Sequence, residues 1–200
     1  MRDRAWNAGV RALDYGCGSG WWTNELASMG FDPFGADISE SGIEMARRAF
    51  PSIGFTTDTS REGLCARGPF ELVTAIEVLP HCFMPREDVS NLYECMAPGG
   101  RFVVCAPYHG YLKNLAMALT GSLERHLDTS WSGAYVHFFS VRTLSVLLRD
   151  AGFVDIEVTR AGRIAPLAKS MIVACRKPSL GLSSVDVSLS SHGRLELVCS

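Results

Sequence analysis

The stretch from Ala12 to Gly20, which reads Ala-Leu-Asp-Tyr-Gly-Cys-Gly-Ser-Gly, limits the fold of this chain more than any other feature. An apolar segment, 10–13, leads into Asp14 and three alternating glycines, and helical periodicity begins at Trp21. Glycine is needed where the backbone takes a positive φ or approaches a ligand closely. The N-terminus of the following helix offers free N–H groups and a positive dipole end to an anion. A strand, a glycine loop and a helix in this order predict a nucleotide-like ligand at the carboxyl edge of a parallel sheet.

The spacing of the glycines separates two kinds of nucleotide ligand. A dinucleotide-binding loop has the pattern Gly-x-Gly-x-x-Gly. Here Gly16, Gly18 and Gly20 alternate, and Trp21 stands where the third glycine of that loop would be. A carboxylate at Asp14 would repel a pyrophosphate and suits a ligand with a cationic end. A NAD-dependent oxidoreductase is therefore the weaker alternative.

The composition is that of a globular protein of one domain. Of the 200 residues, 47% are apolar and 20% charged. The 19 basic and 21 acidic residues give a net charge of −2 without a basic run, so we expect no nucleic acid partner. No apolar run is long enough to span a bilayer, so we expect no integral membrane contact. The seven cysteines are scattered and form no Cys-x-x-Cys pair. They predict no metal site, and reduced thiols in a cytoplasmic protein.

Strand and helix patterns alternate along the chain, which predicts a doubly wound α/β sheet. Apolar segments typical of strands cover 10–13, 32–36, 53–57, 70–76, 101–106, 154–159 and 170–175, and helical patterns cover 21–29, 41–50, 85–97 and 140–151. Between Pro107 and Ser140 lies a connection longer than an ordinary loop. We expect one domain over residues 1–177 and a tail over 178–200 that is disordered, non-native or an added strand pair, because the tail has no clear period.

Two segments carry a resemblance to a known family. The glycine loop resembles motif I of the class I S-adenosylmethionine (SAM)-dependent methyltransferases. The segment Glu77-Val78-Leu79-Pro80-His81 resembles Glu-Val-Leu-Glu-His of the branch with the ubiquinone-biosynthesis O-methyltransferases, except that Pro80 replaces a glutamate. The resemblance covers residues from about Val10 to Lys177. It implies a Rossmann-like, mostly parallel seven-stranded sheet of order 3-2-1-4-5-7-6, in which the last strand is antiparallel.

Ordinary members of that branch have several tens of residues before motif I, whereas nine residues precede Val10 here. A non-catalytic SAM-binding domain, or a truncated and inactive methyltransferase, therefore remains an alternative to an active enzyme.

The positions that follow the strands form the predicted SAM site. Asp37, at the end of the second strand, is placed to bind the ribose hydroxyls. The resemblance implies that Ile38 packs on the adenine and that Asp58 and Thr59 contact its amino group, although Asp58 reads almost equally well as a turn residue. The full set predicted to bind the cofactor is Asp14, Gly16, Gly18, Gly20, Asp37, Ile38, Asp58, Thr59, Ile76 and Glu77, the last two alongside the methionine end.

The predicted chemistry is methyl transfer to a small molecule, at oxygen. The methyl group of SAM is already activated, so the protein must mainly position the nucleophile, and a phenol gains further from a base. His109, just after the fifth strand, and His137, before the last helix, are the catalytic candidates. His81 is either a helix-entry residue or a site residue. Aromatic residues make the connection suitable as a lid over an aromatic or apolar acceptor; they are Trp131, Tyr135, Phe138 and Phe139.

Overall fold

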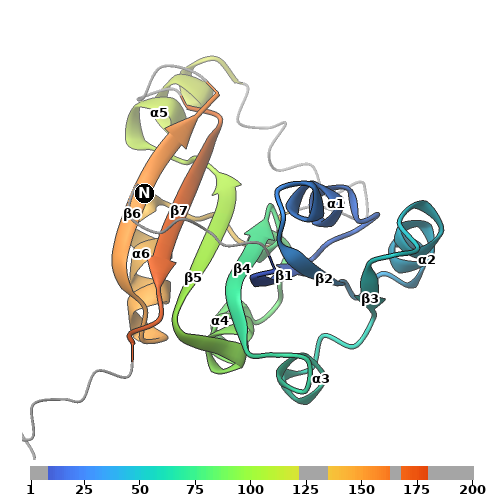
Figure 1. The fold of residues 1–200 in the computed structure, drawn as a ribbon. Helices are drawn as coiled ribbons and strands as arrows, with labels where there is room; N and C mark the ends of the chain where they lie inside the picture. Colours follow the sequence, from blue (N-terminus) through green and yellow to red (C-terminus); the bar gives the residue numbers. More distant parts are fainter. Residues whose placement is uncertain (1–8, 122–134, 163–167, 180–200) are drawn as a thin grey trace, which may run out of the picture.

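The seven strands form one mixed sheet (Figure 1). The computed structural model describes residues 9–121, 135–162 and 168–179. The strand order is β3-β2-β1-β4-β5-β7-β6, with β1 to β5 parallel and β7 antiparallel to both β5 and β6. The predicted sheet is therefore confirmed in order and direction. The strands are β1 Arg11–Tyr15, β2 Asp32–Ala36, β3 Gly54–Thr56, β4 Phe70–Ile76, β5 Met96–Pro107, β6 Val154–Ala161 and β7 Ser170–Arg176.

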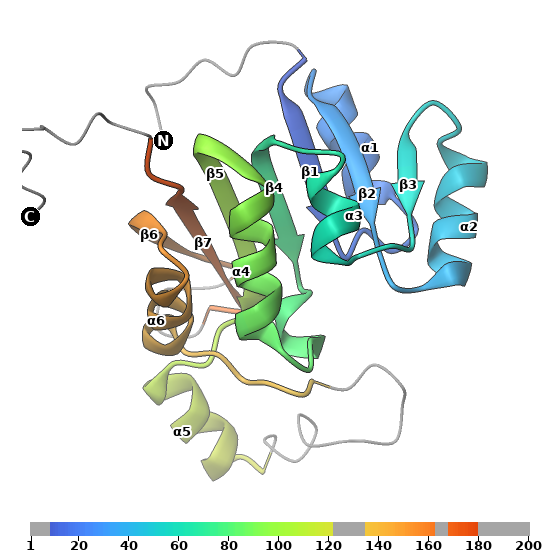
Figure 2. The same ribbon diagram turned by 90° about the horizontal axis from the view of Figure 1, so that it is seen from below.

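Helices cover both faces of the sheet. They are α1 Trp21–Ser28, α2 Glu40–Ala49, α3 Arg61–Cys65, α4 Pro85–Cys95, α5 Tyr111–Leu119 and α6 Val141–Asp150, with a 3-10 helix η1 Leu79–His81. On one face lie α3, α4 and α6 (Figure 2). Their side chains Leu64, Leu92 and Leu144 are fully buried in the largest core cluster. On the other face, Leu26 of α1 packs with Ala12 and Leu72. This two-sided cover explains why the central strands are nearly continuous apolar runs.

The helix boundaries follow local capping chemistry. Helix α6 begins where the sequence predicts, because Ser140 and Thr143 form a capping box. Helix α2 begins at Glu40, one residue before the predicted range 41–50, because Ser39 is the N-cap and its Oγ accepts from the Gly42 amide at 3.1 Å.

Two helices were not predicted. Helix α3 has five residues, too few for a periodic pattern. Helix α5 lies inside the long connection, has no side-chain cap, and leaves Tyr111, Leu112, Leu115 and Leu119 exposed. Its apolar residues therefore do not form the buried stripe by which helices are recognised in sequence.

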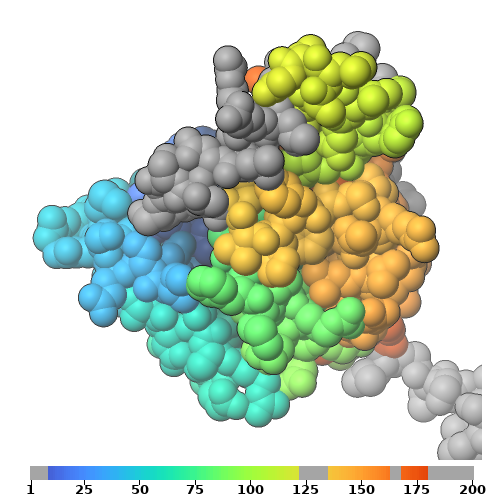
Figure 3. Space-filling view, turned by 180° about the vertical axis from the view of Figure 1, so that it is seen from behind, coloured from blue at the N-terminus to red at the C-terminus, as the bar shows by residue number. Residues whose placement is uncertain are grey.

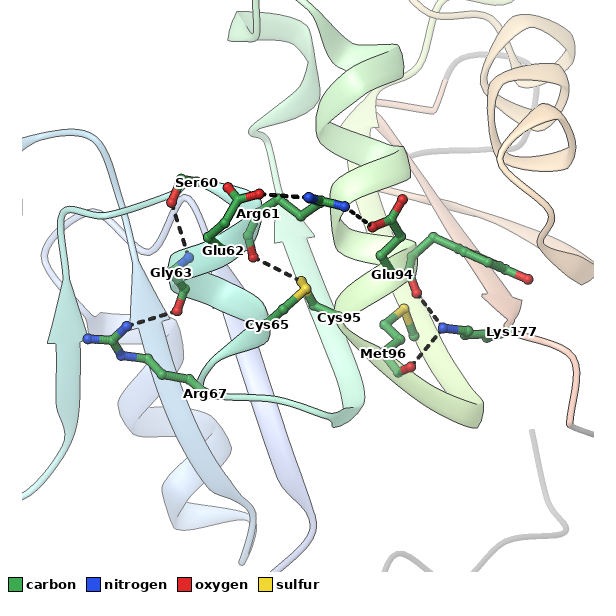
Figure 4. The surroundings of a disulfide bond; sticks show 11 residues. Ser60, Arg61, Glu62, Gly63, Cys65, Arg67, Glu94, Cys95, Met96 and Lys177 are labelled. Atoms are coloured by element: carbon green, nitrogen blue, oxygen red, sulfur yellow. Dashed lines mark hydrogen bonds and ion pairs between the residues drawn. A yellow bond between two sulfur atoms is a disulfide. The ribbon is translucent and has the colours of Figure 1, made fainter.

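A disulfide joins the C-terminal ends of α3 and α4 (Figure 4). Cys65 and Cys95, 30 residues apart in sequence, form the bond. Beside it, Arg61 donates to Glu94 Oε2 at 2.8 Å, which ties the same two helices a second time. The prediction that all seven cysteines are reduced is wrong for this pair. Nothing in the sequence spacing shows that the two helix ends meet in the fold.

Candidate functional site

A cavity of about 520 Å³ lies at the C-terminal ends of β1, β2 and β4. Its volume is within the range of small-molecule sites, and its position is where open α/β sheets bind ligands. In the space-filling view, blue residues of the N-terminal third lie on one side of the hollow, and green and gold residues on the other (Figure 3). Six of the predicted cofactor residues line it, namely Gly16, Asp37, Ile38, Thr59, Ile76 and Glu77.

Asp37 connects the glycine loop to the start of α2. Its Oδ2 accepts from the Gly18 amide at 2.8 Å, and its Oδ1 accepts from the Ser39 amide at 2.8 Å. Each carboxylate oxygen can accept a second hydrogen bond. The side chain is therefore fixed in direction while it keeps acceptor capacity for a ligand.

The three loop glycines have different surroundings. A Cβ at Gly16 would meet Val78 at 2.3 Å, and a Cβ at Gly20 would meet Ala46 and Phe55 at 2.9 Å. A Cβ at Gly18, where φ is +51°, would meet no atom within 4 Å. Gly16 and Gly20 are thus required by packing, whereas open space lies beside Gly18.

Asp14 lies beneath the loop and does not line the cavity. It is 2% exposed, and its oxygens accept from Thr23 Oγ1 at 2.7 Å and from Thr74 Oγ1 at 3.1 Å. Burial raises the pKa of Asp14 to about 6, against the two hydroxyls, which lower it. The carboxyl group therefore fastens β1 to α1 and β4 and fixes the loop from behind.

The turn after β3 carries two predicted site residues, Asp58 and Thr59, which have different surroundings. Thr59 lines the cavity, whereas Asp58 does not. Asp58 Oδ1 accepts from the amide and the hydroxyl of Ser60, and these hydrogen bonds lower the pKa of Asp58. Ser60 in turn caps α3. In the structure Asp58 is thus a turn residue at the entrance to a helix.

Sequence reasoning missed the wall that α4 contributes to the cavity. Glu87, Asp88 and Asn91 line the cavity from α4, and Tyr15 lines it from the end of β1. The Tyr15 hydroxyl donates to Asp88 Oδ1 at 2.8 Å, and burial, together with Asp88, raises the pKa of Tyr15. The sequence signal for this wall was the pair of carboxylates, Glu87 and Asp88, in the first turn of the helix that comes after β4.

Neither catalytic candidate lines this cavity. His109 Nδ1 lies 3.4 Å from Asn114 Oδ1, and its ring meets Phe138 edge to face. His137 Nε2 lies 3.4 Å from the Phe83 carbonyl oxygen. His81 does line the cavity, and its ring stacks on Tyr135.

The predicted lid residues are only partly described. Tyr135 and Phe138 are exposed and Phe139 is buried, whereas Trp131 lies outside the described residues. The amides of Val136 and His137 both donate to the Pro80 carbonyl oxygen, which holds this segment against η1. Pro80, where the resembling branch has a glutamate, thus holds this segment through its carbonyl oxygen.

No cluster of three or more His, Cys, Asp or Glu side chains within the described ranges is arranged to hold a metal ion. In the same part of the chain, no helix is both long enough and apolar enough to cross a membrane.

The family of the chain follows from its sequence match. Residues 2–158 match the model of a family described as a methyltransferase domain. The chain belongs to this family. The strand order and the glycine loop are those that the resemblance in the sequence implied.

Curated relatives come from the predicted branch. A ubiquinone biosynthesis O-methyltransferase of Cereibacter sphaeroides is 33% identical over 90% of this chain and 74% of the relative. Another from a different strain is 36% identical over 57% of this chain, and the match spans about half of that relative, 47%. Among solved structures, magnesium protoporphyrin IX methyltransferase from Synechocystis with bound SAH has a TM-score of 0.61 at 21% identity, covering 85% of this chain and 75% of that chain. This last likeness shows the fold.

Proposed function

We propose that this chain transfers a methyl group from SAM to a hydroxyl oxygen of a small aromatic or apolar molecule. The observation that carries the proposal is the cavity at the sheet edge, whose lining includes Gly16, the fixed carboxylate of Asp37 and the exposed Ile38. The printed names of the curated relatives support oxygen as the acceptor atom.

These residues fit the parts of the cofactor. Asp37 would accept from the ribose hydroxyls, and Ile38, which is 79% exposed, would gain an apolar partner in the adenine. Thr59 would lie near the adenine edge, and Gly16 and Gly18 would let the cofactor approach the backbone. SAM supplies a methyl group on a sulfonium, which needs no further activation. The chain itself must hold the acceptor in line and exclude water.

The proposal keeps the remaining predicted residues in less direct roles. Asp14 and Gly20 would shape the loop, and Asp58 would order the turn that presents Thr59. His109 and His137 stay predicted catalytic residues, although neither lines the cavity. The expected location in the cytoplasm also stays a prediction.

The test is a methyl-transfer assay with isotope-labelled SAM and a panel of phenols and catechols. We expect label in an ether product with wild-type protein and, at limiting SAM, much less label with Asp37→Ala, which should bind the cofactor more weakly. The alternative, a non-catalytic SAM-binding domain, predicts that SAM binds but that no member of the panel is labelled.

A further inference from the structure

One oxygen of the Glu77 carboxylate lacks a hydrogen-bond partner. Its Oε1 accepts from Cys105 Sγ at 3.4 Å and from Ser170 Oγ at 3.5 Å. Its Oε2 is buried, and among the buried side-chain nitrogen and oxygen atoms of the described residues it alone has no partner. Buried polar atoms in native proteins are nearly always hydrogen-bonded. The Oε2 atom therefore lacks a donor. Because Glu77 lines the cavity, a ligand bound there can supply that donor.

The backbone at Glu77 is held in a conformation that non-glycine residues rarely adopt. Its φ is +57°, and its amide donates to the Cys105 carbonyl oxygen at 2.9 Å. Glycine would adopt this conformation without strain. Non-glycine residues in such conformations gather at functional sites, where the side chain is needed. The chain thus keeps a carboxylate at a position where its backbone favours glycine.

The order of the strands gives the side of the cavity that this carboxylate faces. Thr59, Asp37, Gly16 and Glu77 follow β3, β2, β1 and β4, which is their order across the sheet. The Glu77 carboxylate is tied to β5 through Cys105 and to β7 through Ser170, the strands beyond β4. It is therefore held on the side away from Asp37. If the ribose binds at Asp37, the acceptor must lie on this far side.

We propose that the Glu77 carboxylate binds the acceptor hydroxyl and takes its proton, a role distinct from the cofactor contact that the sequence predicts. This inference rests on the proposed function. The acceptor O–H donates to Oε2; as the O–H bond breaks, its electron pair stays on the acceptor oxygen and its proton passes to Oε2. That oxygen forms the new bond to the methyl group, the cofactor leaves as a neutral thioether, and Glu77 returns the proton to water.

The groups around Glu77 suit this role. Burial, and then the Glu77 carboxylate, raise the pKa of Cys105 to about 12, so the thiol stays protonated and keeps donating to Oε1 at neutral pH. Burial and the same carboxylate raise the pKa of Tyr135, whose ring stacks on His81. Tyr135 and His81 thus supply aromatic surface near the carboxylate for a phenolic ring.

The first experiment measures binding without turnover. Calorimetry gives the affinity of wild type and Glu77→Gln for S-adenosylhomocysteine (SAH), and then the affinity of each SAH complex for catechol. We expect Glu77→Gln to change SAH affinity less than about twofold and to weaken catechol binding about tenfold. Glu157→Gln, which changes an exposed carboxylate on β6, is the matched control and should match wild type in both. A variant that loses SAH affinity and keeps catechol affinity would show a cofactor residue and overturn the inference.

The second experiment measures turnover with two acceptors. With catechol at saturating SAM, Glu77→Gln should lower turnover by about 10²–10⁴-fold, and the loss should shrink as rising pH ionises the acceptor. With thiophenol, which ionises far more readily, the loss should be small. A loss confined to His109→Gln or His137→Gln would overturn the inference, as would wild-type protein that binds SAM and methylates no phenol or catechol. A wild type that fails to bind SAM would instead overturn the proposed function.

Discussion

The Asp37 carboxylate lines the cavity and has two roles, one in the fold and one in the proposed site. Asp37 holds the amides of Gly18 and Ser39, and it is the residue proposed to bind the ribose. We predict that Asp37→Ala weakens SAM binding by about 1.5–3 kcal/mol, as expected for hydrogen bonds to a charged group. Asp32→Ala, at the other end of β2, removes an exposed carboxylate and serves as the control. Calorimetry that finds equal SAM affinity in the two variants would remove Asp37 from the ribose site.

The buried carboxyl group of Asp14 leads to a prediction of how the stability of the protein changes with pH. Its pKa is raised to about 6 in the folded protein, from an ordinary value of 3.8, so between pH 4 and 6 the folded state binds more protons than the unfolded state. Stability contributed by this group is therefore present below pH 4 and is lost as the pH rises through 6. The loss is on the order of 2–3 kcal/mol. Asp14→Asn removes this dependence.

Urea unfolding of wild type and Asp14→Asn between pH 4 and 7 tests that prediction. The free energy of unfolding of wild type should fall relative to that of Asp14→Asn as the pH rises. A difference that stays constant, or that changes in the opposite direction, would mean that the carboxyl group is not buried as the structure has it.

At the scale of elements, the disulfide between α3 and α4 closes a loop of 30 residues. Closing a loop of this length stabilises a protein by about 3–4 kcal/mol in the chain-entropy model. We predict that reduction lowers the midpoint of thermal unfolding by about 6–12 °C. A Cys65→Ser/Cys95→Ser variant should show the lower midpoint with or without reductant. Thiol counting that finds all seven cysteines free in the untreated protein would exclude the bond.

Some helices and strands could be predicted from sequence patterns, whereas contacts between distant segments could not. Strands β2 and β4 have the predicted bounds, because their apolar runs are closed by Asp37 and Glu77 at the sheet edge. Helix α6 lies within the predicted range 140–151, because Ser140 caps it and the leucines 144, 147 and 148 recur at helical spacing and are buried. What a pattern cannot show is which distant segments meet, and for this reason the cavity wall of α4 and the Cys65–Cys95 bond were missed.

The site shows the same limit residue by residue. The sequence placed Asp37 and Gly18 at the sheet edge because each directly follows a strand or its loop. It could not show that the Asp14 side chain is buried against α1, because the face of β1 that is covered depends on where α1 packs. It also could not show the direction of Glu77, which is set by Cys105 and Ser170 from two other strands.

At the scale of the whole molecule, we predict that the folded domain ends at Lys177. Its Nζ donates to the carbonyl oxygens of Tyr93 at 2.7 Å and Met96 at 2.9 Å, where the dipole of α4 is negative. Removal of residues 180–200 should leave the thermal midpoint within about 2 °C of wild type, because we expect this serine-rich segment to be a tail outside the core.

A chain that ends at Arg176 should lose about 2 kcal/mol, since the charged hydrogen bonds of Lys177 are lost with it. Differential scanning calorimetry of the two truncations checks both values. If the longer truncation product is as unstable as the shorter one, then residues beyond 179 are part of the fold.

The proposed function depends on which ligand binds in the cavity beside Gly18 and Asp37. Isothermal titration of the full chain with SAM, SAH and NAD tests it most directly. We predict that SAM and SAH each bind at one site, that either one prevents binding of the other, and that NAD gives no heat of binding, because the loop alternates its glycines instead of following the dinucleotide-binding pattern. Binding of NAD in place of SAM, or no binding of SAM by folded protein, would contradict the account.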